Sequence, residues 1–288
     1  MIGCVAAKDA SAQLLICTIN MSLKGYSFPL SPDGRAGLVP PPPWHYSGDF
    51  LIVEYRTNPD NVIALLPPEL TPADDPGAVA AIFADWQSCT DDLHELVDPI
   101  QSQYREFFLV IGGKYQGQPV SRCAYIWVDK DFAMFRGYIQ GFPKKHGSIH
   151  MTRVFPVGKA TPQVVPGGRF GATCTANDRQ IARATVTLRE ISKDGPKVNA
   201  PPLYNSRHFP AATGTRPDVF ELVRATSYDR SGTECWEGDA DLRLYDDTLE
   251  DLQAIAPREI IKGFRFSFAY SVNSTQVIAQ HDKEMLNP

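Results

Sequence analysis

The segment Gly141-Phe142-Pro143-Lys144-Lys145-His146-Gly147 places two adjacent lysines in an apolar turn bounded by glycine and proline. A solvated loop explains this pattern in ordinary terms, because lysine is almost always exposed in folded proteins. A chemical interpretation is also open. An amine attacks a ketone only when unprotonated, and a free lysine, with a pKa of about 10.4, is protonated at neutral pH. Burial beside Phe142, or a second cation such as Lys145, would lower that pKa.

The composition is that of a globular protein and excludes several classes of partner. The chain has 288 residues, 43% hydrophobic and 21% charged, with a formal net charge of −5. A nucleic-acid surface needs a basic stripe, and binding to an anionic membrane needs a cluster of lysine and arginine. Neither is visible, and the apolar runs are shorter than the roughly 20 residues that span a bilayer. We therefore expect no nucleic-acid or membrane partner.

The cysteines suggest a reducing compartment. Six are scattered along the chain without a CxxC pair. In a chain of this size, that spacing favours reduced thiols and a cytoplasmic location, and it argues against structural zinc. Residues 1–22 are mildly apolar but lack a basic start, so a secretory signal is not expected. We predict a disordered or artefactual extension over 1–22 and a single domain over 23–288.

Proline and glycine residues separate many short apolar segments, as in a strand-rich protein with many turns. The pattern predicts strands at 50–55, 107–111, 123–128 and 181–188, and a further strand at 132–138 after a tight connection at 129–131. Phe264, Phe266, Phe268 and Tyr270 recur every second residue, so they are expected on one face of a late strand. Short helices are predicted at 59–66 and 248–255. Without a strict βαβ alternation, an antiparallel-rich α+β fold is favoured.

Other catalytic and binding motifs receive little support. The clusters at Gly112-Gly113 and Gly167-Gly168 lack the spacing and the helix of a dinucleotide site, and hairpin turns explain them better. No GxSxG elbow is present. His146 and His150 are four residues apart, but glycine and serine lie between them and no glutamate accompanies them. We therefore predict no metal site.

Several segments, taken with the lysine turn, resemble the acetoacetate decarboxylase family. The turn is similar to the Tyr-Pro-Lys-Lys signature around that family's Schiff-base lysine. Residues 50–57, Phe-Leu-Ile-Val-Glu-Tyr-Arg-Thr, resemble its early strand, and 67–70, Pro-Pro-Glu-Leu, resemble the segment after its first helix. Residues 234–238, Glu-Cys-Trp-Glu-Gly, and 242–246, Leu-Arg-Leu-Tyr-Asp, resemble its Glu-Ala-Trp-x-Gly and the following strand. The resemblance covers about residues 25–272.

The resemblance implies a fold and a set of site residues. The fold would be an antiparallel, cone-shaped β-barrel with peripheral helices, in a homo-oligomer. Lys144 would form the Schiff base, and Lys145 would be its electrostatic or positioning neighbour. Adjacent residues of an extended chain point to opposite sides, so only one lysine is expected in the pocket. Glu106, in the segment Tyr104-Arg105-Glu106, would handle the substrate or a proton.

This sequence also departs from the family pattern. Gly48 stands where the family's decarboxylases have an arginine, and Asp85 is only the nearest acid to a second active-site glutamate. Gln140, four residues before Lys144, is similar to a glutamine in family members that act as aldolase-dehydratases. Tyr270 would serve there as a general acid or base. Together with Phe142, these residues would bind the substrate.

The implied function is a cofactor-independent lyase acting on a small keto acid through a lysine imine. The first expectation is decarboxylation of a β-keto acid, since the imine accepts the electrons released when carbon dioxide leaves. The alternatives are an aldolase-dehydratase acting on α-keto acids in secondary metabolism, and a small-molecule-binding barrel without catalysis. An intact Lys144-Lys145 pair argues against the last of these.

Overall fold

The structure is a computed structural model that describes residues 22–214, 216–246 and 249–281. The chain divides into two compact units, 1–37 and 38–288. Almost all of the extension predicted over 1–22 lies outside the described residues. In the first unit, Lys24 and Ser31 form an isolated antiparallel bridge. All other elements belong to the second unit, which carries the candidate site.

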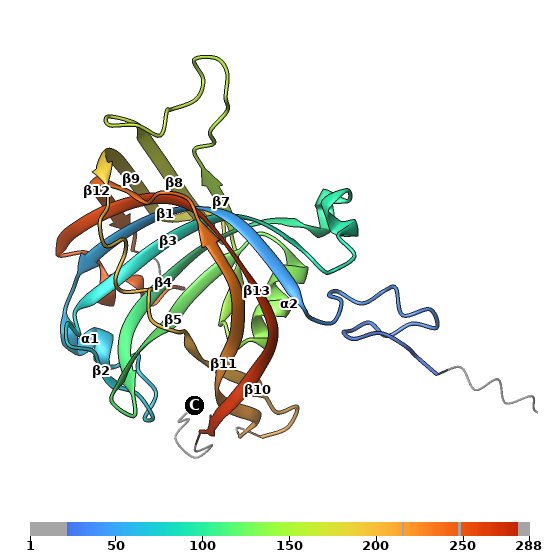
Figure 1. The fold of residues 1–288 in the computed structure, drawn as a ribbon. Helices are drawn as coiled ribbons and strands as arrows, with labels where there is room; N and C mark the ends of the chain where they lie inside the picture. The colour runs from blue at the N-terminus through green and yellow to red at the C-terminus, as the bar shows by residue number, and fades with distance from the viewer. Residues whose placement is uncertain (1–21, 215, 247–248, 282–288) are drawn as a thin grey trace, which may run out of the picture. The chain divides into compact units, whose positions relative to one another are not determined.

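The described part of the second unit consists mainly of strands that form one sheet of thirteen strands (Figure 1). The strands are β1 (Trp44–Arg56), β2 (Thr71–Pro72), β3 (Ala78–Cys89), β4 (Gln103–Tyr115), β5 (Gln118–Val128), β6 (Lys144–His146), β7 (Ser148–Met151), β8 (Arg169–Ala176), β9 (Arg179–Ile191), β10 (Tyr204–Pro210), β11 (Pro217–Gly232), β12 (Trp236–Leu244) and β13 (Glu259–Gln280). The helices are α1 (Pro59–Ile63) and α2 (Asp131–Ile139), with 3₁₀ helices η1 (His94–Leu96), η2 (Pro99–Gln101) and η3 (Asp251–Ile255).

The sheet follows the order β6-β5-β4-β3-β1-β13-β12-β9-β8-β7, with β2, β10 and β11 attached beside this path. Among the strand pairs of the described residues, β5 and β6 run parallel and the others are antiparallel. Gly147 alone separates β6 from β7 in the chain, so the two ends of the path lie next to each other. The pairs found in the described part do not include β6 with β7, and full closure of the barrel stays a prediction.

Alternation along the long strands separates two hydrophobic clusters. In β1, Leu51 and Val53 belong to one cluster, whereas Phe50 and Ile52 belong to the other. Phe264, Phe266, Phe268 and Tyr270 all join the second cluster, which confirms the face predicted for this strand. The strands predicted at 50–55, 107–111, 123–128 and 181–188 are confirmed within β1, β4, β5 and β9. Lys144 lies beside the second cluster.

The strand predicted at 132–138 is wrong, because this segment forms α2. Two signals explain the helix: Asp131 is an acid in its first turn, and Gly141 follows its end with a φ of 79°. Acids favour helix N-termini, and a glycine of positive φ is common just past the C-terminus. The helix predicted at 59–66 is confirmed over 59–63 as α1, where the side chain of Asn58 accepts a hydrogen bond from the Asp60 amide.

In the other predicted helix, 251–255 form η3, and 248 lies outside the described residues. None of the helices in the described ranges has the length and apolar character needed to cross a membrane.

Candidate active site

Lys144 is a buried lysine whose amine points into the protein. It is the first residue of β6 and pairs with Ile126 of β5. Tyr138 fixes the backbone here, because its hydroxyl donates a hydrogen bond to the carbonyl of Lys144 at 2.8 Å. The side chain is 8% exposed. Its Nζ donates to the carbonyl of Ala133 at 2.9 Å and forms an ion pair with the carboxylate of Glu106.

The alkyl chain of Lys144 lies over Gly137 of α2. A Cβ placed on Gly137 would lie 2.4 Å from both Cδ and Cε of Lys144, closer than real Cβ contacts allow. Ala133 and Gly137 are four residues apart, so they share one face of the helix. This face of α2 contacts the side chain of Lys144. The carbonyl of Ala133 accepts a hydrogen bond from Nζ, and the absence of a side chain at Gly137 leaves room for the alkyl chain.

Glu106 is held between Lys144 and Trp86. The glutamate lies on β4 and is 5% exposed. One carboxylate oxygen contacts Lys144 Nζ, and the other accepts a hydrogen bond from the indole Nε1 of Trp86 at 3.0 Å. Trp86 in turn packs on Gly48, where a Cβ would lie 2.6 Å from Cε3 of the indole. The position at which the resemblance implies an arginine is therefore filled by this tryptophan.

Arg136 brings a second buried cation to the site. Its side chain is 5% exposed, and it donates a hydrogen bond to Ser88 Oγ at 2.9 Å. Its guanidinium lies over four aromatic rings, with centroids at 5.9 Å for Trp44, 4.9 Å for Tyr46, 5.6 Å for Tyr104 and 5.5 Å for Phe132. Within the described ranges, no carboxylate forms an ion pair with it. A buried guanidinium without a carboxylate partner is suited to bind a substrate anion.

These surroundings lower the pKa of Lys144. Burial is the largest cause, because it disfavours the ammonium form. Glu106 opposes the change, both through its charge and through its hydrogen bond, whereas the charge of Arg136 adds to it. The pKa stays below that of a free lysine because the loss of hydration outweighs the attraction of one carboxylate. A larger share of the amine is therefore unprotonated and nucleophilic at neutral pH.

Lys145 lies on the opposite face of β6, as expected for adjacent residues of an extended chain. Its side chain is 46% exposed, and its Nζ forms an ion pair with Glu250 and lies 5.1 Å from the ring centroid of Trp127. Trp127 also donates a hydrogen bond to Glu250 at 3.2 Å. Among the main causes of the lowered pKa of Lys144, the second cation is Arg136, whereas Lys145 pairs with Glu250.

Of the residues proposed for substrate binding, Phe142 lies beside the lysine, whereas Gln140 and Tyr270 both contact Tyr46. Phe142 has its ring centroid 5.7 Å from Lys144 Nζ. Gln140 is 7% exposed and donates from Nε2 to the hydroxyl of Tyr46 at 3.4 Å. Tyr270 stacks on Tyr46, with ring centroids 4.9 Å apart. Burial raises the pKa of both tyrosines, so their hydroxyls stay protonated.

Asp85 is not brought to the site. It lies on β3 next to Trp86, and neighbouring residues of a strand point to opposite faces. Its carboxylate accepts a hydrogen bond from Arg105 Nε at 3.4 Å and lies 3.8 Å from Nε of Arg153. In this segment the residue that contacts Glu106 is Trp86, whereas Asp85 contacts Arg105 and Arg153.

Sequence reasoning missed Arg136 and Gly137, and the signal for both was the helix. Read as a strand, residues 132–138 give no reason to group Arg136 with Gln140. Read as a helix, these two residues are four apart and share a face, as do Ala133 and Gly137. The acid at Asp131 followed by the glycine at 141 was the available evidence for that helix.

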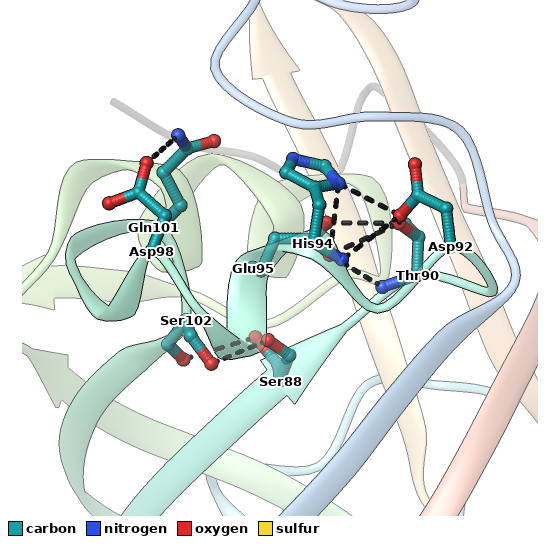
Figure 2. Close-up of polar contacts among 8 residues, drawn as sticks. All are labelled: Ser88, Thr90, Asp92, His94, Glu95, Asp98, Gln101 and Ser102. Carbon is teal, nitrogen blue, oxygen red and sulfur yellow. Dashed lines mark hydrogen bonds and ion pairs between the residues drawn. The ribbon is translucent and has the colours of Figure 1, made fainter.

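One cluster of possible metal ligands occurs in the described part of the chain: Asp92, His94 and Glu95. Figure 2 shows that these groups hydrogen-bond to one another and to Thr90 in the connection between β3 and β4. These hydrogen bonds therefore stabilise the connection between β3 and β4. His146 and His150, weighed above as metal ligands, are both exposed on β6 and β7.

We expect Lys144 to become reactive at a lower pH than a free lysine. Burial, aided by Arg136, lowers its pKa, so the proton should leave before a solvent-exposed ammonium would lose it. In the unfolded chain the proton is retained to about pH 10.4, so the free energy of unfolding should rise with pH between the two pKa values.

The measurement is the acylation rate of Lys144 against pH, located by peptide mass spectrometry. The exposed Lys145 beside it serves as an internal reference for reagent activity. A rate for Lys144 that is half-maximal near the free-lysine pKa would contradict the buried-amine interpretation.

The family model for acetoacetate decarboxylase (ADC) matches residues 27–281. Among curated proteins, no sequence matches the chain. Among solved structures, the enduracididine biosynthesis enzyme MppR, complexed with the condensation product of pyruvate and imidazole 4-carboxaldehyde, is 38% identical with a TM-score of 0.85. That match covers 90% of this chain and 97% of MppR. MppR is also similar in a complex with pyruvate, at a TM-score of 0.84.

Two other structures extend the comparison. An acetoacetate decarboxylase-like enzyme from Sphingomonas wittichii RW1 is 28% identical over 89% of this chain and 99% of its own, with a TM-score of 0.82. The acetoacetate decarboxylase of Legionella pneumophila is 21% identical over 90% of this chain and 97% of its own, with a TM-score of 0.70, which shows the shared fold. The strand-rich α+β architecture thus matches that of acetoacetate decarboxylase-like structures. With its family model matched over residues 27–281, the chain belongs to the acetoacetate decarboxylase family.

Proposed function

We propose that the protein is an imine-forming enzyme that acts on a small 2-oxo acid and catalyses an aldol-type reaction coupled to dehydration. The observation that carries this proposal is the grouping of Lys144, Glu106 and Arg136 in one apolar site. It supplies a nucleophilic amine, a carboxylate that accepts its proton, and a buried cation for the substrate carboxylate. The similarity to MppR, whose structures contain pyruvate and a condensation product of pyruvate, supports this choice of substrate.

The reaction begins at the amine. Lys144 passes a proton to Glu106, and its Nζ attacks C2 of the 2-oxo acid. The resulting carbinolamine loses water to give a protonated imine, which withdraws electrons from the neighbouring carbon. Loss of a proton from C3 forms an enamine. Its C3 attacks the carbonyl carbon of an aldehyde, whose oxygen takes up a proton to become a hydroxyl group. C3 then loses a second proton and the hydroxyl group leaves as water, which forms the conjugated double bond. Water then hydrolyses the imine and releases Lys144.

The remaining side chains fit roles in this sequence. Arg136 holds the carboxylate of the 2-oxo acid with charge-assisted hydrogen bonds, so the carboxylate stays on the product. Gln140 and Tyr46 present neutral hydrogen-bond donors, which suit an oxygen that gains and loses a proton. Tyr270 stacks on Tyr46 and shields the pair from water. The hydrogen bond from Trp86 Nε1 orients the carboxylate of Glu106 toward Lys144.

Decarboxylation of a β-keto acid is the second candidate, because the same imine accepts the electrons of the breaking carbon-carbon bond. One feature supports decarboxylation. A negatively charged Glu106 beside Lys144 would repel a carboxylate held near the imine, and this repulsion would favour its departure as carbon dioxide. Trp86 fills the space beside Gly48, so no cation occupies that position. We expect decarboxylation of acetoacetate to be slow for that reason.

A parallel assay separates the two candidates. The enzyme is incubated with acetoacetate, and separately with pyruvate and an aromatic aldehyde, while carbon dioxide release and conjugated-enone absorbance are followed. We expect enone formation that is lost in Lys144→Ala and reduced in Gln140→Ala. Rapid carbon dioxide release from acetoacetate without enone would instead favour the decarboxylase.

A substitution at Arg136 tests the carboxylate site. We expect Arg136→Met to lower imine trapping with pyruvate by roughly 10- to 100-fold, the magnitude of a lost hydrogen bond to a charged group. Trapping with hydroxyacetone, a neutral ketone, should change little. The measurement is the rate of borohydride trapping read by intact mass, with Arg136→Lys as the charge-preserving control. Equal losses for the acid and the neutral ketone would assign Arg136 a structural role.

A further inference from the structure

A second cavity lies away from the Lys144 site. Its volume is about 630 Å³, which is within the range of small-molecule sites. Residues of β1, β4, β5, β12 and β13 line it, together with residues of the connections 73–78 and 192–201. Lys144, Glu106 and Arg136 do not line it. The cavity is therefore a candidate site for a ligand that the proposed reaction does not use.

Buried apolar side chains separate this cavity from the catalytic amine. Glu54 lines the cavity from β1, and Phe50 lies four residues earlier on the same face of that strand. The pairing of β1 with β3, and of β3 with β4, places Phe50 level with Glu106. Four residues of a strand span roughly 13 Å. Phe50 and Ile52, which are 5% and 0% exposed, lie within this interval, so a small molecule beside Glu54 does not reach Lys144.

The charges of the cavity wall leave one carboxylate without a cation. The described lining contains five acids and four cations. Four ion pairs use all of these cations: Arg56 with Asp75, Lys114 with Asp74, Lys197 with Asp194, and Lys262 with Glu237. The fifth acid is Glu54, which forms no ion pair with any of the described residues.

Glu54 is buried and held in place by the backbone. It is 4% exposed, and its Oε1 accepts hydrogen bonds from the amides of Lys197 and Val198, both at 2.7 Å. Within the described ranges, Oε2 accepts no hydrogen bond and is the oxygen open to a ligand. Burial raises the pKa of Glu54, and the two amides and the charge of Lys197 only partly oppose this change. A cation at Oε2 would offset the cost of burying the carboxylate.

We propose that this cavity binds a primary ammonium group carried on a short apolar chain. Because the two amides occupy Oε1, the compact ammonium suits Glu54 better than a guanidinium, which pairs with both oxygens of a carboxylate. Val120 and Phe264, each 3% exposed, line the same cavity and give the chain an apolar surface. This inference concerns a second site and does not depend on the proposed reaction.

Pentylamine and 1-pentanol test the proposal, because at neutral pH they differ in the ammonium group and share the chain. The protein is labelled with ¹³C in its isoleucine methyl groups, and each compound is titrated to about 20 mM, which detects millimolar affinity. Ile261 lines the cavity and Ile126 pairs with Lys144, so their NMR signals report the two sites separately. Pentylamine should shift the Ile261 signal with a dissociation constant at least about 10-fold below that of 1-pentanol, and leave Ile126 unchanged.

Substitution of Glu54 tests the carboxylate itself. Glu54→Gln keeps the length of the side chain and an oxygen for the two amides, but it removes the charge. The dissociation constant for pentylamine should rise at least about 10-fold, whereas that for 1-pentanol should stay the same. Asp74→Asn is the matched control, because Asp74 lines the same cavity and pairs with Lys114. It should change either constant by less than about 3-fold, as expected for an exposed pair.

Other outcomes count against the site. Equal affinity for the amine and the alcohol would overturn it, and so would a pentylamine response at Ile126, or none at Ile261 at the highest concentration. A folded Glu54→Gln protein that binds pentylamine as the wild type does contradicts the role of the carboxylate. Tighter binding of pentylguanidine than of pentylamine contradicts the choice of a primary ammonium. Because amine and alcohol are compared on the wild-type protein, the test stands even if Glu54→Gln does not fold.

Discussion

Lys144→Ala is expected to abolish the covalent adduct that borohydride traps with a keto acid. Without the amine no imine forms, and removal of a covalent nucleophile typically costs at least about 1,000-fold in rate. The measurement is intact mass after incubation with pyruvate and borohydride, followed by peptide mapping. In the wild-type enzyme the mass of one reduced substrate should appear on the peptide that contains Lys144. An adduct of the same yield in Lys144→Ala would remove Lys144 from the mechanism.

Two further variants separate chemistry from folding. Lys144→Ala leaves Glu106 buried without its ion-pair partner, and breaking a buried pair in this way costs about 3–5 kcal/mol. Lys144→Met keeps most of the alkyl chain over Gly137 and also lacks the amine. If both variants are folded and neither forms the adduct, the loss is chemical. Thermal unfolding of each variant provides the comparison.

Lys145→Ala is the matched control for the adjacent position. Lys145 pairs with Glu250 on the opposite face of β6, so its loss should not raise the pKa of Lys144. The adduct should still form, with a yield reduced less than about 10-fold through a looser β6, since the interaction of a half-exposed pair is worth about 1 kcal/mol or less. A Lys144 that becomes as basic as free lysine in this variant would restore the electrostatic role of Lys145.

The fold was largely predictable because its strands carry strong local patterns. Phe264, Phe266, Phe268 and Tyr270 alternate with polar residues, and that alternation defines a face whatever the strand pairs with. The resemblance around Lys144 supplied the global arrangement, which no local pattern contains. The pairing of β1 with β13, more than 200 residues apart in the chain, is an example: Phe50 lies opposite Phe266, and neither segment indicates the other.

The candidate site was predictable only in part, for a reason of geometry. Lys144, Glu106 and Gln140 come from motifs in the chain; Lys144 and Glu106 form an ion pair, and Gln140 contacts Tyr46. Arg136, Gly137 and Trp86 have no motif, and they are found only through what they touch. The strand predicted at 132–138 hid two of them, because a helix groups residues four apart whereas a strand groups residues two apart. Asp85 was chosen over its neighbour Trp86 by residue type, although the pleat of β3 turns the tryptophan toward Glu106.

Substitution of Gly137 by alanine is the second change expected to have a large effect on the reactivity of Lys144. An alanine there would place a methyl group 2.4 Å from Cδ and Cε of Lys144, so the lysine side chain must leave its position over α2. The helix itself should tolerate the change, since alanine is favoured over glycine in a helix by about 1 kcal/mol. Gly137→Ala should therefore remain folded while Nζ moves away from Glu106 and the carbonyl of Ala133.

We expect Gly137→Ala to slow imine trapping by about 100-fold, because a displacement of about 1 Å in a reacting group can cost that much. The pKa of Lys144 should also rise toward that of free lysine, since the displaced amine is less buried. Gly171→Ala is the matched control, because a Cβ at Gly171 in β8 meets no atom closer than 3.6 Å. Trapping rates and acylation profiles of both variants, with their unfolding temperatures, make the comparison. A Gly137→Ala enzyme that traps pyruvate at the wild-type rate would show that Lys144 does not need this position to react.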